Sequence, residues 1–143
     1  MQAGNGPVEH CSWQEVQGLV RKIAAEIRKD KYDCVLAIAN GGIIPAKLLA
    51  EELGIDQIML IPVRGKQVIE AEMPRLQEGK KYLVIDDIYD TGDIYKKVSR
   101  ATQGFDCTFV FCMSRYPQEF GAYGELLNHE RWIVFPWEKT PTG

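Results

Sequence analysis

The stretch from Tyr82 to Ile94 decides the fold, and it reads YLVIDDIYDTGDI. It opens with the apolar run Leu83–Ile85, which is typical of a strand buried on both faces of a sheet. The chain then turns acidic at Asp86 and Asp87, and a helical pattern follows the loop Asp90–Gly92. In an open parallel sheet, ligands bind where the carboxyl end of a strand leads into a helix. The stretch therefore predicts a ligand site at the end of a buried strand.

Two loops of this chain are suited to hold anionic groups. Thr91 and Gly92 offer a hydroxyl and backbone N–H groups to a phosphate at the start of a helix. Upstream, a buried strand ends in Asn40-Gly41-Gly42 and leads into a second helix, and glycines let backbone N–H groups approach a phosphate closely. Both loops should lie at one sheet edge, where a ribose with phosphates at both ends would fit between them. Several aspartates beside such an anion would repel it, so Mg²⁺ is the expected cofactor.

The rest of the chain alternates between helical and strand patterns. Ser12 and Glu15 fit a capping box at the start of a helix that extends to about Lys29. Further helices should end at Gly54 and Gly104. Apolar runs predict strands over 32–39, 57–63 and 107–113, whereas residues 118–131 form a polar region. This alternation predicts a parallel α/β sheet covered by helices, in a single domain over residues 1–143 with a flexible tail over 1–8.

Composition excludes several classes of function. A hydrophobic fraction of 45% and a charged fraction of 26% are normal for a soluble globular protein. The net charge of −3 gives no support to nucleic-acid binding. We find neither a membrane span nor a secretory signal pattern. The 4 cysteines lack CxxC spacing, and buried free thiols in a cytoplasmic protein are the expectation.

Two segments carry a resemblance to a known family. The stretch Tyr82–Ile94 resembles the phosphoribosyl diphosphate (PRPP) motif of the type I phosphoribosyltransferases, with Ile94 in place of a final Thr. The carboxy-terminal segment Trp132–Glu138, WIVFPWE, resembles the purine-binding end of the bacterial and archaeal xanthine-guanine and hypoxanthine-guanine phosphoribosyltransferases. The resemblance runs from about Glu9 to Glu138. It implies the Rossmann-like fold of that family, with helices on both faces of a parallel sheet and a small carboxy-terminal base-binding region.

The resemblance also implies a reaction and a role for each matching residue. The phosphoribosyl group of PRPP would pass to guanine, xanthine or hypoxanthine, giving a nucleoside monophosphate and pyrophosphate in purine salvage. Asp90 would accept the N7 proton of the base. Asp86 and Asp87 would bind the ribose and, directly or through water, Mg²⁺. The 5-phosphate would lie against Asp90, Thr91, Gly92, Asp93 and Ile94. Pyrophosphate would lie against Asn40, Gly41, Gly42, Arg64 and Lys66. The base would contact Arg115, Trp132, Ile133 and Glu138.

Some positions depart from the family pattern and leave a second function open. Asn40 stands where the family usually has Arg or Lys, Arg115 stands near a position usually held by lysine, and Asp93 and Ile94 alter the phosphate loop. Asn40, Asp93 and Ile94 favour a protein of the same fold that senses PRPP or nucleotides with little turnover, whereas Asp90 and Trp132 favour the enzyme. Two alternatives stay open for Arg115: it replaces that lysine as the donor to the 6-oxo group, or the base differs. The segment 64–81 is interpreted either as a mobile loop over PRPP or as an ordinary hairpin. A homo-oligomer, dimer or tetramer, is expected from the resemblance.

Overall fold

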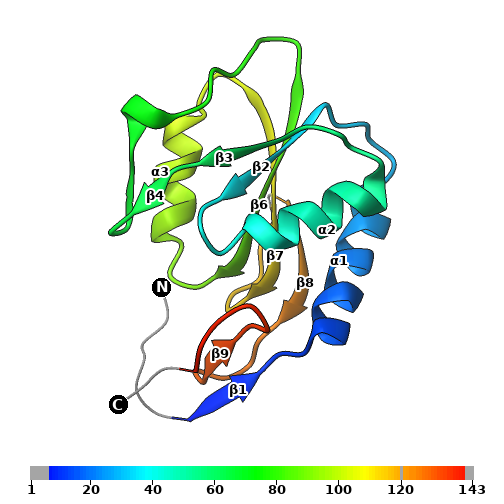
Figure 1. Ribbon diagram of the computed structural model, residues 1–143, viewed down its shortest axis with the longest axis vertical. Helices are drawn as coiled ribbons and strands as arrows, with labels where there is room; N and C mark the ends of the chain where they lie inside the picture. The colour runs from blue at the N-terminus through cyan, green and yellow to red at the C-terminus, as the bar shows by residue number, and fades with distance from the viewer. Residues whose placement is uncertain (1–6, 120, 141–143) are drawn as a thin grey trace.

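The centre of the molecule is a five-stranded parallel sheet with strand order β3-β2-β6-β7-β8 (Figure 1). The computed structural model describes residues 7–119 and 121–140. The strands of this sheet are β2 (Cys34–Ile38), β3 (Ile58–Ile61), β6 (Lys81–Tyr89), β7 (Asp106–Ser114) and β8 (Gly121–Leu126). The predicted parallel α/β architecture is confirmed, and the strand of the opening stretch lies at the middle of the sheet.

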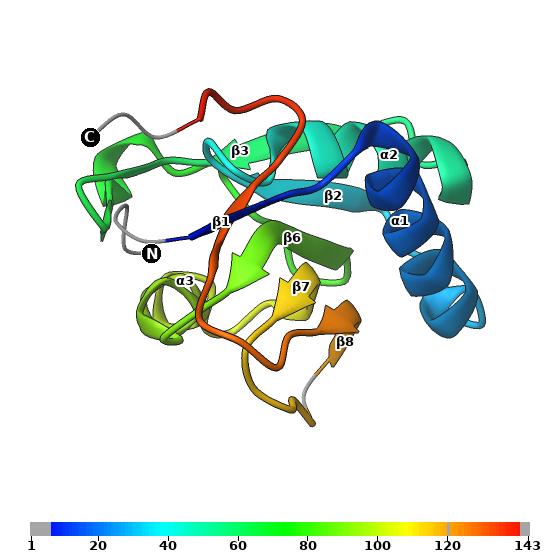
Figure 2. The same ribbon diagram turned by 90° about the horizontal axis from the view of Figure 1, so that it is seen from below.

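Helices cover both faces of the sheet, as Figure 2 shows from below. Helices α1 (Trp13–Ile27) and α2 (Ile43–Leu53) pack on one face, and α3 (Asp93–Ala101) packs on the other. Alternate residues of β6 serve the two layers, since Leu83 packs with α1 and α2 while Val84 packs with α3. None of the described helices is long and apolar enough to cross a membrane.

Local signals in the sequence placed the start of α1 and the end of α2 correctly, whereas α1 and α3 end earlier than predicted, α3 at Ala101 and not at Gly104. The Ser12 hydroxyl accepts a hydrogen bond from the Glu15 N–H at 3.1 Å, which is one half of the predicted capping box. Helix α2 stops at Gly54, which has a left-handed φ of 70° and donates its N–H to the last turn. Helix α1 ends at Ile27, two residues before the predicted Lys29.

Strand β8 lies inside the region that the sequence presented as polar. It is the edge strand of the sheet, and only Ala122 and Gly124 are buried within it. A Cβ at Gly121 would collide with the Phe109 carbonyl oxygen, and one at Gly124 would lie 2.7 Å from the Cys112 carbonyl oxygen. The positions of β8 that lie close to the β7 backbone need glycine, so the sequence lacks the hydrophobic alternation by which a strand is usually recognised.

A second, two-stranded sheet joins the two ends of the chain. Strand β1 (Val8–His10) pairs in parallel with β9 (Trp132–Val134), with Val8 opposite Trp132 (Figure 1). The predicted tail over 1–8 is wrong at Val8, which is held in this strand, and residues 1–6 of that tail lie outside the described residues. The amino-terminal segment thus supports the segment predicted to bind the base.

The segment after β3 contains a hairpin. Strands β4 (Val63–Arg64) and β5 (Gln67–Val68) pair antiparallel, and the 3₁₀ helix η1 (Glu70–Glu72) follows. The two turn residues have left-handed φ values, 57° at Gly65 and 62° at Lys66, as a type I′ turn requires. A hairpin therefore occupies residues 63–68 at the start of this segment, and closure of the segment over PRPP stays a prediction.

The cysteines are free thiols, as predicted. Cys11, Cys34 and Cys112 are buried and Cys107 is half-buried. Burial raises the pKa of Cys11 to about 12, with a further contribution from the charge of Glu15. These side chains therefore act as small apolar core residues.

Gly42→Ala should destabilise the fold. A Cβ at this position would lie 2.9 Å from the Ile38 carbonyl oxygen and would also collide with the Ile85 carbonyl oxygen. Both are backbone atoms of neighbouring strands and cannot move independently. We expect the free energy of unfolding, measured by urea denaturation, to fall by roughly 2–4 kcal/mol.

Gly18→Ala is the matched control, because Gly18 lies in α1 and a Cβ there would meet nothing within 4 Å. It should stabilise the chain by about 0.5–1 kcal/mol. Equal effects of the two substitutions would show that the contact at Gly42 is not a constraint.

Candidate active site

The two predicted loops meet at the carboxyl edge of the sheet. Strands β2 and β6 are parallel neighbours, with Ala37 opposite Ile85, so the residues that follow them lie side by side. A cavity of about 280 Å³ opens there, lined by the Asn40–Gly41 loop, by the Asp86–Asp87 pair, by the hairpin turn and by the carboxy-terminal segment. Eight of the residues that the sequence predicted for the site line this cavity: Asn40, Gly41, Lys66, Asp86, Asp87, Ile94, Trp132 and Glu138.

A smaller cavity of about 60 Å³ adjoins it at the start of α3. Its lining includes Asp90, Thr91, Gly92 and Asp93, together with Asp86, Asp87 and Ile94. The structure therefore brings together the residues assigned to the ribose and to the 5-phosphate.

Four of the predicted site residues lie apart from these cavities. Gly42 is buried at the start of α2, and its N–H donates to the Ile38 carbonyl oxygen at 2.8 Å. Ile133 is fully buried in the core. Arg64 forms a bidentate ion pair with Glu72 at 3.1 and 2.6 Å, on the surface. Arg115 contacts Asp90 behind the loop, with its guanidinium almost completely buried.

The electrostatics of the site centre on Asp86 and Asp87. Burial raises the pKa of Asp86 well above its ordinary value, and the neighbouring charge of Asp87 raises it further. Burial also raises the pKa of Asp87. Backbone N–H groups hold both carboxylates in place, Asp87 N–H to Asp86 at 2.8 Å and Ile88 N–H to Asp87 at 2.7 Å. The pair would gain from a cation, which would neutralise two carboxyls that burial disfavours as anions.

The glycine of the β2 loop makes room for this pair. A Cβ at Gly41 would lie 2.6 Å from the carboxyl carbon of Asp87, so any larger residue would displace the acid. The preceding Ala39–Asn40 peptide bond is cis. The Asn40–Gly42 loop therefore packs directly against the Asp87 carboxylate.

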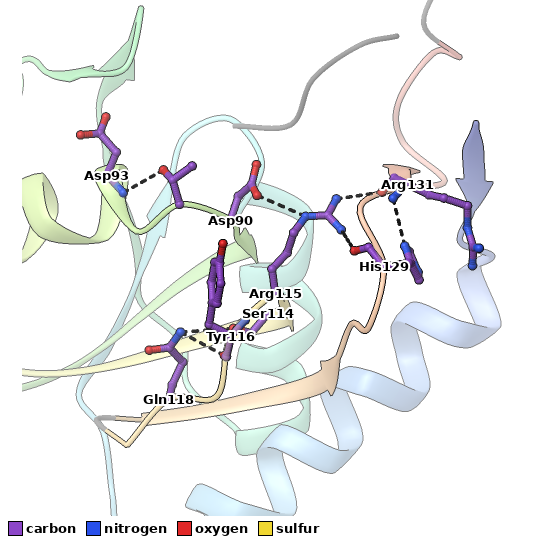
Figure 3. Close-up of polar contacts among 9 residues, drawn as sticks. Asp90, Asp93, Ser114, Arg115, Tyr116, Gln118, His129 and Arg131 are labelled. Carbon is purple, nitrogen blue, oxygen red and sulfur yellow. Dashed lines mark hydrogen bonds and ion pairs between the residues drawn. The ribbon is translucent and has the colours of Figure 1, made fainter. Parts of the chain in front are cut away.

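The phosphate loop balances its own negative charge. The Asp93 N–H donates to the Thr91 hydroxyl at 3.2 Å, which shapes the start of α3 (Figure 3). The Asp93 carboxylate pairs with Lys97, one turn further along the helix, at 3.1 Å. Lys97 also donates to the Lys66 carbonyl oxygen at 2.7 Å. One lysine therefore neutralises Asp93 and fastens the hairpin turn to α3.

Several lining residues were missed from the sequence, Tyr89 and Gly65 among them. Tyr89 lines the smaller cavity and packs so closely on Gly92, whose φ is 87°, that a Cβ there would collide with the tyrosine hydroxyl. Its position between the acidic residues of the opening stretch was the available signal. Gly65 lines the larger cavity beside Lys66, and the Gly–Lys pair between two short apolar runs could have indicated the turn.

The structure therefore has an α/β fold with two glycine-containing loops at the carboxyl edge of its sheet, where open parallel sheets bind ligands. Residues 12–114 match the phosphoribosyl transferase domain, and the chain belongs to this family.

Several known proteins are similar to the chain. A xanthine-guanine phosphoribosyltransferase of Idiomarina loihiensis is 24% identical over 136 residues, covering 89% of this chain and 84% of that protein. The structure of a purine phosphoribosyltransferase from Pyrococcus horikoshii has a TM-score of 0.80 at 24% identity, covering 95% of this chain and 97% of the other. A hypothetical protein from Neisseria gonorrhoeae, solved with bound ppGpp, has a TM-score of 0.73 at 20% identity, covering 96% and 92%. The predicted type I phosphoribosyltransferase fold is confirmed.

Asp86→Asn should stabilise the chain, increasingly so as pH rises. The raised pKa keeps a proton on Asp86 in the folded chain at pH values where the unfolded chain has lost it. Wild-type stability therefore falls as pH rises above the ordinary value of about 3.9 and through the raised pKa. Asparagine has no such proton and retains an oxygen for the Asp87 N–H.

Urea denaturation at pH 4.5 and pH 8 would measure this difference, with Asp106→Asn at an exposed position as the control. A gain from Asp86→Asn that is the same at both pH values would contradict the electrostatic explanation.

Proposed function

We propose that this chain transfers the phosphoribosyl group of PRPP to a 6-oxopurine, giving a nucleoside monophosphate and pyrophosphate. The observation that carries the proposal is one cavity that joins the Asn40–Gly41 loop, the Asp86–Asp87 pair and Trp132. Those features suit, in turn, a pyrophosphate, a ribose and a purine ring. Family membership supports the reaction class, and the names of the relatives support a purine acceptor.

The phosphates would occupy the two loops. The 5-phosphate fits the smaller cavity, where Thr91 supplies a hydroxyl and the first turn of α3 supplies backbone N–H groups. Pyrophosphate fits beside Gly41, with Lys66 as the nearby cation on the hairpin turn. Lys97 holds that turn through the Lys66 carbonyl, which would keep the cation over the cavity.

The acidic pair suits Mg²⁺. Carboxylate oxygens are the hard ligands that this ion prefers, and the raised pKa values of Asp86 and Asp87 show carboxyls that a cation would stabilise as anions. When bound, the ion would neutralise charge on the pyrophosphate leaving group. Asp86 and Asp87 would hold it directly or through water, and would accept hydrogen bonds from the ribose hydroxyls.

The remaining chemistry is positioning and proton transfer. The ribose would develop oxocarbenium character, which nearby carboxylates stabilise without a covalent intermediate. Asp90 would accept the N7 proton of the base as the new bond forms. Trp132 would stack on the purine, and Glu138 lines the same end of the cavity.

A second candidate function is binding of PRPP or a nucleotide with little turnover. Asn40 supports it, because this lining residue lacks the charge that family members usually place beside pyrophosphate. The same fold also occurs in a protein from Neisseria gonorrhoeae with bound ppGpp. The two functions differ in one observable, the release of pyrophosphate.

The test is an assay of pyrophosphate release that depends on PRPP and Mg²⁺, with guanine, xanthine, hypoxanthine and adenine as acceptors. We expect turnover with at least one of the three 6-oxopurines and little with adenine. PRPP binding without release for any base would favour the second function, and neither binding nor release would overturn both.

Trp132→Ala should raise the KM for the purine by about tenfold or more and leave the Kd for PRPP nearly unchanged. Stacking on an aromatic ring contributes roughly 1–3 kcal/mol for nucleic-acid bases, and about 1.4 kcal/mol corresponds to tenfold in affinity. Trp13→Ala is the control, since Trp13 is 48% exposed and lies at the start of α1. An unchanged KM in folded Trp132→Ala protein would assign Trp132 to packing alone.

A further inference from the structure

Arg115 makes an unusual set of contacts just beyond the end of β7. Its side chain is 4% exposed, and Nε lies 3.2 Å from the carboxylate of Asp90, whose side chain is 15% exposed. The two terminal nitrogens donate to the carbonyl oxygens of His129 at 2.7 Å and Arg131 at 2.8 Å (Figure 3). Its own backbone N–H donates to the Tyr89 carbonyl oxygen at 2.9 Å. Arg115 therefore connects the end of β7 to two other segments.

The joined segments are the two that the reaction must align. Asp90 belongs to the loop after β6, whereas His129 and Arg131 belong to the connection that leads directly into Trp132 at the start of β9. Among the described residues, those lining the two cavities do not include Arg115. The guanidinium thus lies behind the site, between the proposed proton acceptor and the proposed stacking residue.

The same connection has a second anchor on its outer side. Glu9 of β1 pairs with the Arg131 side chain at 2.6 Å and with His129 at 3.3 Å. Both Glu9 and Arg131 are substantially exposed, and exposed pairs contribute little to stability. Removing one partner of a buried pair is far more damaging, because it leaves an uncompensated charge. Arg115 is therefore the stronger of the two anchors.

We propose that Arg115 is a positioning residue that fixes the distance between the Asp90 carboxylate and the base-stacking segment. The proposal rests on the proposed function. The planar fork of arginine reaches Asp90 and two carbonyl oxygens in fixed directions. It holds the acid so that its oxygen meets N7 when the purine lies on Trp132. In this arrangement a group other than Arg115 donates a hydrogen bond to the 6-oxo group of the base.

Arg115→Lys separates this role from direct contact with the base. Lysine keeps the charge and three donors but loses the planar fork, so it cannot hold all three acceptors in the same geometry. We expect kcat/KM for the purine to fall on the order of 10–100-fold, with kcat reduced as well as KM raised. The Kd for PRPP should change much less, because the Thr91–Asp93 hydrogen bond and the Asp93–Lys97 pair shape the rest of the phosphate loop without Arg115.

Two controls accompany this variant. Arg21→Lys changes an exposed arginine that pairs with Glu52 on the helical face, and it should leave all kinetic constants unchanged. Hydrogen exchange of the backbone over residues 127–131 should speed up in Arg115→Lys and not in Arg21→Lys.

Each result decides the proposal. If Arg115 donated to the 6-oxo group directly, an ammonium could replace it, and Arg115→Lys would keep its kinetic constants; that result overturns the proposal alone. A purely structural role would lower the free energy of unfolding and leave kcat and KM of the folded protein intact, which also overturns it. A wild-type chain that binds PRPP but releases no pyrophosphate overturns the proposed function, and this proposal with it.

Discussion

The site is built around two adjacent, half-buried carboxyl groups on a central strand. Asp86 and Asp87 follow the last pair between β6 and β2, at Ile85, while β6 stays paired with β7 as far as Tyr89. Their desolvated surroundings raise the pKa of both. Their neighbours are constrained accordingly. Gly41 must lack a side chain because Asp87 fills that space, and successive backbone N–H groups must point at the carboxylates. Two such carboxylates are unfavourable as neighbouring anions, and a bound cation would stabilise them.

Charge is balanced locally around this centre. Asp93 carries a charge that would oppose a phosphate, and Lys97 pairs with it along the same helix. Asp90 is paired with Arg115 from the neighbouring strand. The residue that the family usually supplies as a cation in the β2 loop is here Asn40, while Lys66 reaches the same cavity from the hairpin. The charge that Asn40 lacks can therefore be supplied by Lys66, which the hairpin brings to the same cavity.

The sequence predicted the features that depend on local pattern. The apolar run before Asp86 identified the central strand, Ser12 and Gly54 identified helix ends, and the alternation of elements identified the parallel sheet. Features that depend on distant partners could not be predicted. Strand β8 has no hydrophobic signature because β7 presses on its glycines. The contacts of Arg115 join residues 14, 16 and 25 positions away, and no short-range pattern encodes them. Arg64 was assigned by charge alone, and its pairing with Glu72 depends on the hairpin.

The pairing of β1 with β9 has a consequence for how the site assembles. Val8 lies opposite Trp132, so this small sheet closes almost the whole chain into a loop. Contacts of such sequence separation are entropically costly and form slowly. The phosphate loops, in contrast, are set by β2, β6 and the helices that directly follow them. Local folding around β2 and β6 should therefore form the phosphate loops of the cavity first. The part of the cavity beside Trp132 should form only when β1 pairs with β9, and local opening should be most frequent there. A purine that binds beside Trp132, as proposed, would then enter and leave through the part of the cavity that depends on the pairing of β1 with β9.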